Sequence, residues 1–496
     1  MPLLPRLLAL SFVAVLPTVP LTAQCPDGSP PPCRPQGTRL RPAPNSVAVL
    51  YFDNLSRDTA DAYLADGLTE EIIIRLGQVQ RLEVKSRFEV QPYRGHALPD
   101  PPALGRSLAA AYLLTGSVQR AGDQVRLRAE LVRAANRAQV WGDVFDRNGS
   151  NLLTVESDIA GAVATAIAGH LLPEERTRLT RPLTADPIAY EEYLRGVEAR
   201  RNAFDEPSIR SALTHFARAI AQDSGFAAAY AGQAQAWVDL ADGYIAGREG
   251  YARAAAAARQ AIARDSLLAL PYAMLSSAAL ALDFDGREAE RLARRAVTLD
   301  PRRAEAHGRL GDALWGAGRL DEALSERRRA WELDSLSADN GYLYVDMLLF
   351  SHRLDSAAAF LPRYRRVAPS PNADLLAGRL LAARGDLRGA ALLLNWRSYG
   401  GQAAGTYVRA LLARGDTLAA RATLDSMLAA RTSGYFNPLA IARAYVAFGD
   451  IDRGMEWLQR AFEERTIWLT VVRADDELAP LRADPRYAAL DQQLKY

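Results

Sequence analysis

The chain repeats its own pattern at a spacing of 34 residues across residues 276–335, and this period constrains the fold more than any other feature. Two alanines of the first copy, Ala289 and Ala296, return as Ala323 and Ala330 in the second. A helix-turn-helix unit of this length cannot bury its apolar stripe alone, so neighbouring units must stack. The period therefore predicts a helical solenoid, and it favours binding over catalysis.

The second copy, LGDALWGAGRLDEALSERRRAWELDS over residues 310–335, resembles a tetratricopeptide repeat. The resemblance implies a superhelix of antiparallel hairpins whose inner groove commonly holds an extended peptide or partner segment. We expect an all-α array of about eight hairpins over residues 188–496. It should end in a cap formed by residues 476–494.

Length and charge indicate what accompanies the repeats. At 496 residues the chain exceeds one usual core, so a second folded region is expected. The 60 basic residues nearly balance the 58 acidic ones, which disfavours a nucleic-acid partner. Beyond the amino terminus no stretch reaches the ~18 apolar residues of a membrane span, so none is expected in the mature chain.

The first 23 residues have the pattern of a secretory signal peptide. Arg6 precedes an apolar stretch at residues 7–16, and a small-residue cleavage site ends at Ala23. A lipoprotein signal is the alternative because Cys25 is close by, but Gln24 stands where lipid-modifying processing requires a small residue. The pattern predicts an exported protein, periplasmic or secreted, with lipid anchoring less favoured.

Residues 24–44 form a Pro-rich segment that we interpret as a stiff linker. It contains the only two cysteines, Cys25 and Cys33, which could close a small disulfide loop in an oxidising compartment. Two thiols without neighbouring histidines make an incomplete zinc site, and the five histidines are scattered. We expect no metal and no cofactor.

Residues 45–172 are predicted to form an α/β domain of about five strands and three helices. The apolar runs at residues 46–52 and 82–90 fit strands, and period-two alternation predicts three more. The alternating residues of one such strand should mark a single buried face; they are Val125, Leu127, Ala129 and Leu131. The later strands are expected at residues 111–120, 124–133 and 138–147, and the helices at residues 62–79, 103–111 and 152–170.

This region resembles the TolB-like amino-terminal domain that precedes tetratricopeptide repeats in many bacterial proteins. The resemblance rests on AVLYFDNLSRD, YLADGLTEEIIIRL and AAYLLTGSVQRAGDQVRLRAELVRAANRAQVWGDVFDR. In TolB itself the corresponding domain is a periplasmic interaction module. Relatives often carry it behind a membrane helix and a winged-helix, nucleotide-cyclase or kinase domain; here the signal peptide takes that place, so none of those activities is implied. Residues 173–187 are expected to join the domain to the repeats.

The α/β domain offers one candidate ligand loop. Asp53 and Asn54 follow the first strand, where open α/β sheets often bind ligands, and Asp66, Glu70 and Glu71 add carboxylates on the next helix. The interpretation we favour is structural: a turn or helix cap for the first two residues and a solvated face for the others. No Gly-rich phosphate loop, G-x-S-x-G turn or H-E-x-x-H pair occurs, so we predict a non-enzyme.

In the repeats an arginine column is the candidate binding site. Arg379, Arg409 and Arg443 each lie six residues before a turn glycine, a register that faces the groove in tetratricopeptide repeats. Arginine suits bidentate contact with carboxylates, so the column predicts an acidic peptide partner. Internal pairing with Asp and Glu of neighbouring helices is the alternative. Asp312 takes this register in an earlier repeat and interrupts the column, and Trp315 is a further candidate for groove contact.

Together these features predict a non-enzymatic scaffold of the cell envelope that binds proteins through its groove and its α/β domain. One alternative is a hydrolase or other enzyme with an unrecognised site in the α/β domain, which a cleft with strongly perturbed carboxylates would reveal. Another is a periplasmic ligand sensor that signals to a separate membrane protein.

Overall fold

The computed structural model describes residues 42–58, 61–79, 81–122, 124–148, 155–180, 182–202, 205–335, 337–367, 370–397, 401 and 403–495. Within it, Pro42–Tyr496 form one compact unit. The predicted signal peptide, most of the predicted linker, and Cys25 and Cys33 lie outside the described residues.

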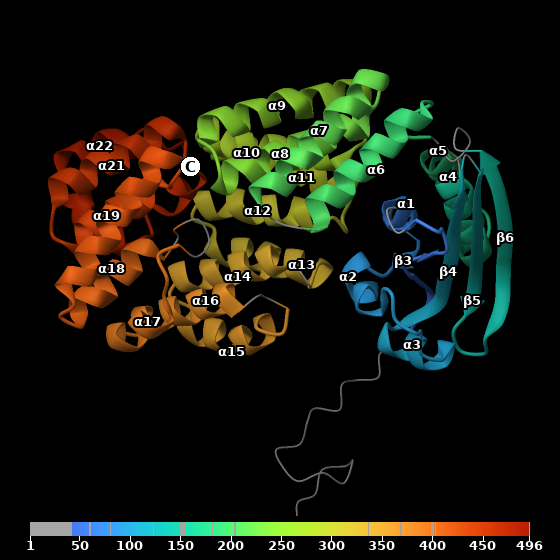
Figure 1. Ribbon diagram of the computed structural model, residues 1–496, viewed down its shortest axis with the longest axis horizontal. Helices are drawn as coiled ribbons and strands as arrows, with labels where there is room; N and C mark the ends of the chain where they lie inside the picture. The colour runs from blue at the N-terminus through green and yellow to red at the C-terminus, as the bar shows by residue number, and fades with distance from the viewer. Residues whose placement is uncertain are drawn as a thin grey trace, which may run out of the picture. The chain divides into compact units, whose positions relative to one another are not determined.

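A mixed sheet opens this unit, with strand order β3-β1-β4-β5-β6 and β2 paired to β4 (Figure 1). Strand β1 runs parallel to β3 and β4, whereas β4, β5 and β6 are antiparallel. A tight turn joins β4 to β5 at Gly122, whose φ of +59° suits glycine. The strands are β1 (Ala43–Val49), β2 (Asp53–Asn54), β3 (Glu83–Val84), β4 (Ala110–Ala121), β5 (Gln124–Arg133) and β6 (Ala138–Asn148).

The predicted strand at residues 82–90 is wrong beyond its first residues. Within this stretch only Glu83 and Val84, which form β3, pair with β1. The chain then forms a short helix, α2 (Arg87–Val90). Ser86 caps this helix: its hydroxyl accepts from the Glu89 N–H while the Glu89 carboxylate accepts from the Ser86 N–H. A reciprocal capping box stabilises a helix start and so ends the strand.

Other element boundaries in this region also differ from the predicted ones. Strand β1 begins inside the predicted linker, and the predicted helix at 103–111 ends at Ser107 because Ala110 already starts β4. Up to residue 172 the described residues contain six strands and four helices, where about five and three were expected, and a fifth helix lies in the segment predicted to be a junction. The helices are α1 (Ala62–Gly77), α2, α3 (Pro101–Ser107), α4 (Val155–Ala168) and α5 (Pro173–Thr180), with the 3₁₀ turn η2 (Gln91–Tyr93) after α2.

The buried face predicted for β5 is confirmed. Val125, Leu127, Ala129 and Leu131 are all nearly inaccessible to solvent, and they belong to a core shared with α1 and α4. The same core includes Tyr190 and Leu194 of the first solenoid helix. The sheet region and the first repeat are therefore joined by continuous apolar packing.

A helical solenoid follows the sheet region, built from eight consecutive hairpins among the described residues (Figure 1). The second helices of three successive hairpins begin at Gly286, Leu320 and Leu354, which confirms the period of 34 residues. The pairs are α6 (Pro187–Asn202) with α7 (Glu206–Gln222), α8 (Ala227–Gly243) with α9 (Gly247–Arg264), α10 (Ala269–Leu282) with α11 (Gly286–Leu299), α12 (Ala304–Gly316) with α13 (Leu320–Leu333), α14 (Ala338–Phe350) with α15 (Leu354–Tyr364), α16 (Ser370–Ala383) with α17 (Leu387–Leu393), α18 (Ala404–Ala413) with α19 (Thr417–Ser433), and α20 (Pro438–Ala447) with α21 (Ile451–Glu464).

Six hairpins place a residue with positive φ at the turn between their two helices. Four of them place glycine there, with φ between +74° and +90°: Gly318, Gly385, Gly415 and Gly449. The other two place Phe284 (φ +52°) and His352 (φ +54°) at the same register. Side chains other than glycine are strained in this region at a cost of about 1–3 kcal/mol each, so these two turns need a separate explanation.

After α21 the chain forms the 3₁₀ turns η5 (Ile467–Val471) and η6 (Asp476–Ala483) and the short helix α22 (Pro485–Asp491). Residues 466–495 are called the clasp below. They include the predicted cap. Within the part of the chain that the structure describes, no helix combines the length and apolar character needed to cross a bilayer.

A buried charge cluster joins α1, α4 and α5 of the sheet region. The Arg75 guanidinium lies 3.1 Å from Glu71 and 3.4 Å from Glu156, and it donates to the Leu179 carbonyl at 2.9 Å. Glu156 is fully buried, and burial raises the pKa of its carboxyl to about 8, against the opposing charge of Arg75. The Tyr190 hydroxyl beside this cluster has no hydrogen-bond partner among the described residues.

We expect the Glu156→Gln variant to show a free energy of unfolding that varies less with pH than that of the wild type. The folded-state pKa of about 8 lies above the ordinary value of 4.5, so the protonated carboxyl contributes stability below pH 4.5. That contribution is lost as the pH rises towards 8. One pKa unit corresponds to about 1.4 kcal/mol, so the two profiles should diverge by a few kcal/mol in urea unfolding.

Glu174→Gln on α5 is the matched control, because the Glu174 side chain is exposed and is not among the groups that shift the pKa of Glu156. It should leave the pH profile of the wild type unchanged. Parallel profiles for the wild type and Glu156→Gln would contradict a buried carboxyl that is neutral at pH 7.

Candidate protein-binding surface

The arginine column lies on three successive first helices of the solenoid. Arg379 is on α16, Arg409 on α18 and Arg443 on α20, and these helices contact one another in order. Most first helices pack against the next first helix as well as against their own partner, and the surface that the first helices line is called the inner surface below. The register predicted from the turn glycines therefore brings the three residues to one surface.

Each arginine already faces a carboxylate of the same chain. Arg379 pairs with Asp346 of α14, Arg443 Nε donates to Asp475 Oδ2 at 2.6 Å, and Arg409 lies 3.5 Å from Glu477. This arrangement is the internal pairing that was the alternative to a binding site. Asp346 belongs to a neighbouring helix, as that alternative expected, but Asp475 and Glu477 belong to the clasp.

The clasp does not satisfy every donor of the column. The Arg443 and Asp475 side chains are only 3% and 4% exposed, yet Arg443 Nη2 is buried without a hydrogen-bond partner among the described residues. Arg409 Nε is in the same state. A buried donor without a partner costs about 1–3 kcal/mol, so the pairing stabilises this surface less than its charges suggest.

The end of the clasp returns to an earlier part of the solenoid. The Lys495 N–H donates to the Phe284 carbonyl at 3.0 Å, and the Gly286 N–H donates to the Lys495 carbonyl at 3.1 Å. Val471 of η5 packs in one apolar cluster with Leu310 and Trp315 of α12. The clasp therefore connects the last hairpins to the third and fourth.

Trp315 does not line an open groove, contrary to the prediction. Its side chain is 5% exposed and packs against Phe350 with ring centroids 6.4 Å apart, as well as against Val471. Trp315 does lie on the first helix of its hairpin, as predicted, but Val471 of the clasp packs against it. Asp312 pairs with Arg327 and lies 3.5 Å from Arg309.

The candidate loop at Asp53 and Asn54 is a short strand, β2, instead of a loop after a strand. The Asn54 side-chain oxygen accepts from the Ser56 N–H at 2.9 Å, an Asx turn of the kind that the structural alternative predicts. Asp53 is exposed. Neither residue contributes to the lining of the cavity described below.

The carboxylates of α1 are buried, which corrects the solvated face expected for them. Asp66, Glu70 and Glu71 are 3%, 7% and 5% exposed. Their arginine partners are Arg94, Arg87 and Arg75 respectively. Two of these arginines follow β3 in the sequence, so helical periodicity within α1 gave no sign of them.

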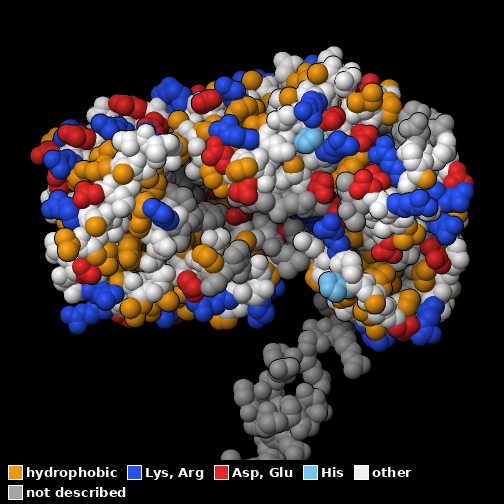
Figure 2. Space-filling model, in the orientation of Figure 1, with side chains coloured by type: hydrophobic (Ala, Val, Ile, Leu, Met, Phe, Trp, Pro, Cys, Tyr) orange, Lys and Arg blue, Asp and Glu red, His pale blue; other side chains and the backbone are white. Residues whose placement is uncertain are grey.

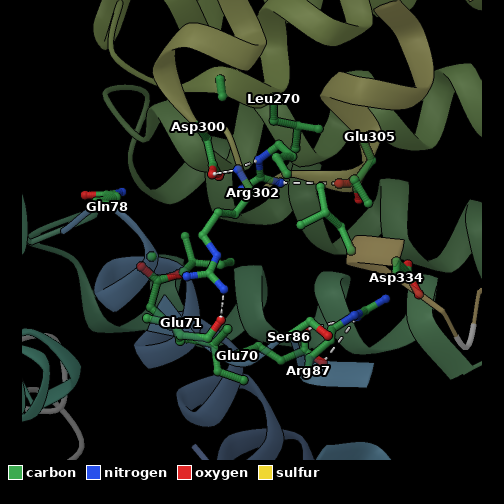
Figure 3. Close-up of a pocket in the computed structure, with 18 of the residues that line it drawn as sticks. Glu70, Glu71, Gln78, Ser86, Arg87, Leu270, Asp300, Arg302, Glu305 and Asp334 are labelled. Carbon is green, nitrogen blue, oxygen red and sulfur yellow. Dashed lines mark hydrogen bonds and ion pairs between the residues drawn. The ribbon is translucent and has the colours of Figure 1, made fainter. Parts of the chain in front are cut away.

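A cavity of about 790 Å³ lies between α1, β3 and α2 on one side and the starts of α10 and α12 on the other (Figure 3). Arg302 reaches across it and donates to the backbone carbonyls of Leu82, at 3.3 Å, and Val84. It therefore covers the free edge of the sheet at β3, which would otherwise be open to pairing with another strand.

Two carboxyl groups in the cavity wall are held in different ionisation states (Figure 3). Burial raises the pKa of Asp334 to about 8, with Arg87 opposing the rise. Burial also acts to raise the pKa of Glu305, but Arg303 and Arg200 more than offset it and hold that pKa at about 2. At pH 7 the wall thus offers one carboxyl that donates a hydrogen bond and one that accepts.

This pair was missed from the sequence because its members belong to separate repeats, and because their pKa shifts come from burial at Asp334 and from the nearby Arg303 and Arg200 at Glu305. The only available signal was that Asp300 and Asp334, both on the cavity wall, share a register 34 residues apart. Elsewhere in the described ranges no group of three or more His, Cys, Asp or Glu side chains could hold a metal ion. On the face drawn in Figure 2, acidic and basic side chains are interspersed.

No family model matches the sequence. Over 192 residues it is 33% identical to a protein of Rhizobium meliloti (strain 1021) named "Putative adenylate cyclase 3". The match covers 38% of this chain and 32% of that protein. The chain therefore spans about a third of the length of this relative, and the name describes the relative alone.

Similar solved structures include several tetratricopeptide proteins. A thermophilic tetratricopeptide protein of Thermus thermophilus is 22% identical with a TM-score of 0.33, over 40% of this chain and 98% of its own. The type IV pilus biogenesis factor PilW is 14% identical with a TM-score of 0.33, over 44% and 92%. Yeast Tom70 is 15% identical with a TM-score of 0.37, over 61% and 67%. All three scores are below 0.5, and the repeat organisation is established by the helix spacing instead.

We expect Asp346→Ala to lower the free energy of unfolding by about 3–5 kcal/mol, because it leaves the Arg379 charge buried without its partner. Replacing both residues, as Arg379→Met with Asp346→Leu, should cost much less. Chemical denaturation of the two variants measures the difference. Asp355→Ala is the matched control, since its pair with Arg384 is exposed and should contribute little.

Proposed function

We propose that this chain is a non-enzymatic scaffold that binds segments of partner proteins on the inner surface of its solenoid. The observation that carries the proposal is the arginine column, two members of which contact a short acidic segment of the clasp through Asp475 and Glu477. A surface that recognises such a segment within its own chain has the chemistry to recognise one in another. An acidic peptide is therefore the proposed partner class.

We place this scaffold in the bacterial cell envelope, among periplasmic or other exported proteins. The support is the signal-peptide pattern of the first 23 residues. The balance of 60 basic and 58 acidic residues supports protein partners over nucleic acid. The TolB-like sheet region is proposed as a second protein contact, on the resemblance alone.

We expect a photo-crosslinking residue placed at position 409 in the native host to give discrete protein adducts. Arg409 is the most exposed arginine of the column, with a side chain that is 38% exposed, so a bound segment would lie within reach. The matched position is Leu418 on the second helix α19, which is 83% exposed. Mass spectrometry should assign adducts at 409 that are absent at 418; identical adduct sets from both positions, or none at 409, would contradict binding at the inner surface.

The cavity favours a second candidate function, a site for a small polar ligand that would serve sensing or hydrolysis. Its specific support is the pair formed by Asp334 and Glu305, whose pKa values of about 8 and 2 are driven apart. Environments of this kind mark acid and base groups in functional sites, although structural ion-pair networks also produce them.

For this candidate we expect a metabolite screen to find a compound that raises the melting temperature of the wild type but not of Asp334→Ala, which has no side-chain donor. Because the protonated Asp334 donates in the bound state, the effect should weaken above about pH 8. Asp355→Ala, which removes an exposed carboxylate far along the solenoid, is the control. A screen in which every stabilising compound acts equally on all three proteins would remove this candidate.

A further inference from the structure

We propose that the clasp is an intramolecular pseudo-ligand: its residues 471–478 occupy the surface where a partner's acidic segment binds, and the clasp must be displaced before that partner binds. This inference rests on the proposed function and adds the partner's chemistry and a means of control. The argument comes from what the clasp presents, what it leaves unsatisfied, and how it is held.

The clasp presents two carboxylates flanked by aliphatic side chains. Asp475 and Glu477 meet Arg443 and Arg409, while the flanking residues fill apolar sites. These flanking residues are almost fully buried: Val471, Val472, Leu478 and Leu481. A displacing partner must therefore offer two carboxylates at i and i+2 together with aliphatic side chains on both sides, because charge alone would not replace the apolar contacts.

The closed arrangement leaves donors that a better ligand would satisfy. Arg443 Nη2 and Arg409 Nε have no hydrogen-bond partner among the described residues, although both atoms are buried. In the clasp itself, Arg482 Nε is also buried without a hydrogen-bond partner among the described residues. A partner that supplies one more carboxylate oxygen to the column gains a charge-assisted bond that the clasp does not make.

Strained backbone surrounds the clasp. Phe284 and His352 occupy turn positions that other hairpins give to glycine, and each contacts this region. The Phe284 carbonyl accepts from Lys495 and its ring lies 4.2 Å from the Arg465 guanidinium, while His352 Nε2 lies 3.6 Å from the Asp476 carboxylate. Arg465, which connects α21 to the clasp, is itself left-handed with φ +59°.

These observations explain why glycine is absent at two turns. At positions 284 and 352 a side chain is retained in a left-handed conformation where it touches the clasp or the arginine that precedes it. Opening the clasp needs a change of backbone at Arg465, and that change releases strain at this residue. The geometry thus places a hinge where a segment of about thirty residues could leave the surface as a unit.

The first test uses a labelled peptide with the sequence of residues 471–481, VVRADDELAPL, added to the full-length mature chain. We expect the variant Asp475→Ala/Glu477→Ala, whose clasp is weakened, to bind it at least tenfold more tightly than the wild type in fluorescence anisotropy. Glu456→Ala is the matched control, because Glu456 is an exposed acidic residue of α21 that lies outside the clasp. It should bind like the wild type.

Adding Arg443→Ala to the double variant should abolish the gain in peptide binding. Equal affinity for the wild type and the double variant would overturn the proposal, since the clasp would then not compete. So would the absence of peptide binding by a double variant whose circular dichroism matches that of the wild type.

A reversible lock keeps the proposal testable if the double variant fails to fold. Asp285 and Lys495 are bridge partners in parallel pairing, so Asp285→Cys/Lys495→Cys should form a disulfide that holds the clasp closed. We expect oxidation to remove partner adducts at position 409 and reduction to restore them. Asp285 also caps α11, and the double-cysteine variant lacks this cap in both redox states. The lost cap therefore does not affect the comparison between the oxidised and reduced protein.

The lock also separates this inference from the proposed function. Equal partner adducts at position 409 in the oxidised and reduced states would overturn the pseudo-ligand while leaving the scaffold function intact. No adducts in either state, with adducts also absent from the wild type, would overturn both.

Discussion

Every hairpin of the solenoid has two apolar faces to bury, and the whole structure depends on covering the faces at its two ends. At the start, Tyr190 and Leu194 of α6 enter the core of the sheet region, so the sheet acts as the first cap. At the end, Leu478 and Leu481 of the clasp cover α20 and α21. A linear array of repeats would otherwise expose one unpaired face at each end.

The clasp also determines which charged side chains are buried. The first helices carry arginines on their inner surface, and closing the clasp removes those charges from water. Desolvating a guanidinium is unfavourable unless a carboxylate and further hydrogen bonds compensate, which is why Asp346, Asp475 and Glu477 lie where they do. The compensation is incomplete at Arg409 and Arg443, so these pairs contribute more to where the clasp docks than to how tightly it is held.

Features encoded over short distances were predictable from the sequence. The period of 34 residues, the alternation in β5 and the glycines at four turns depend on neighbours along the chain, and all three are confirmed. The S-x-x-E pattern at Ser86 was equally local and was overlooked in favour of a strand. The carboxylate partners in the clasp lie 32 residues from Arg443 and 68 residues from Arg409, and the burial of Trp315 depends on Val471, more than a hundred residues away. No local pattern contains contacts at these separations.

The two turns without glycine show how a repeat protein departs from its repeat. The register requires positive φ at positions 284 and 352 as firmly as at Gly318 between them, and the hairpins adopt it in all three cases. Glycine would remove a strain of about 1–3 kcal/mol at each position. Only a contact made by the side chain can offset that cost, and the contacts present are those of Phe284 with Phe462 and Arg465, and of His352 with Asp476. The exceptions to the repeat therefore lie where the last residues of the chain return to its middle.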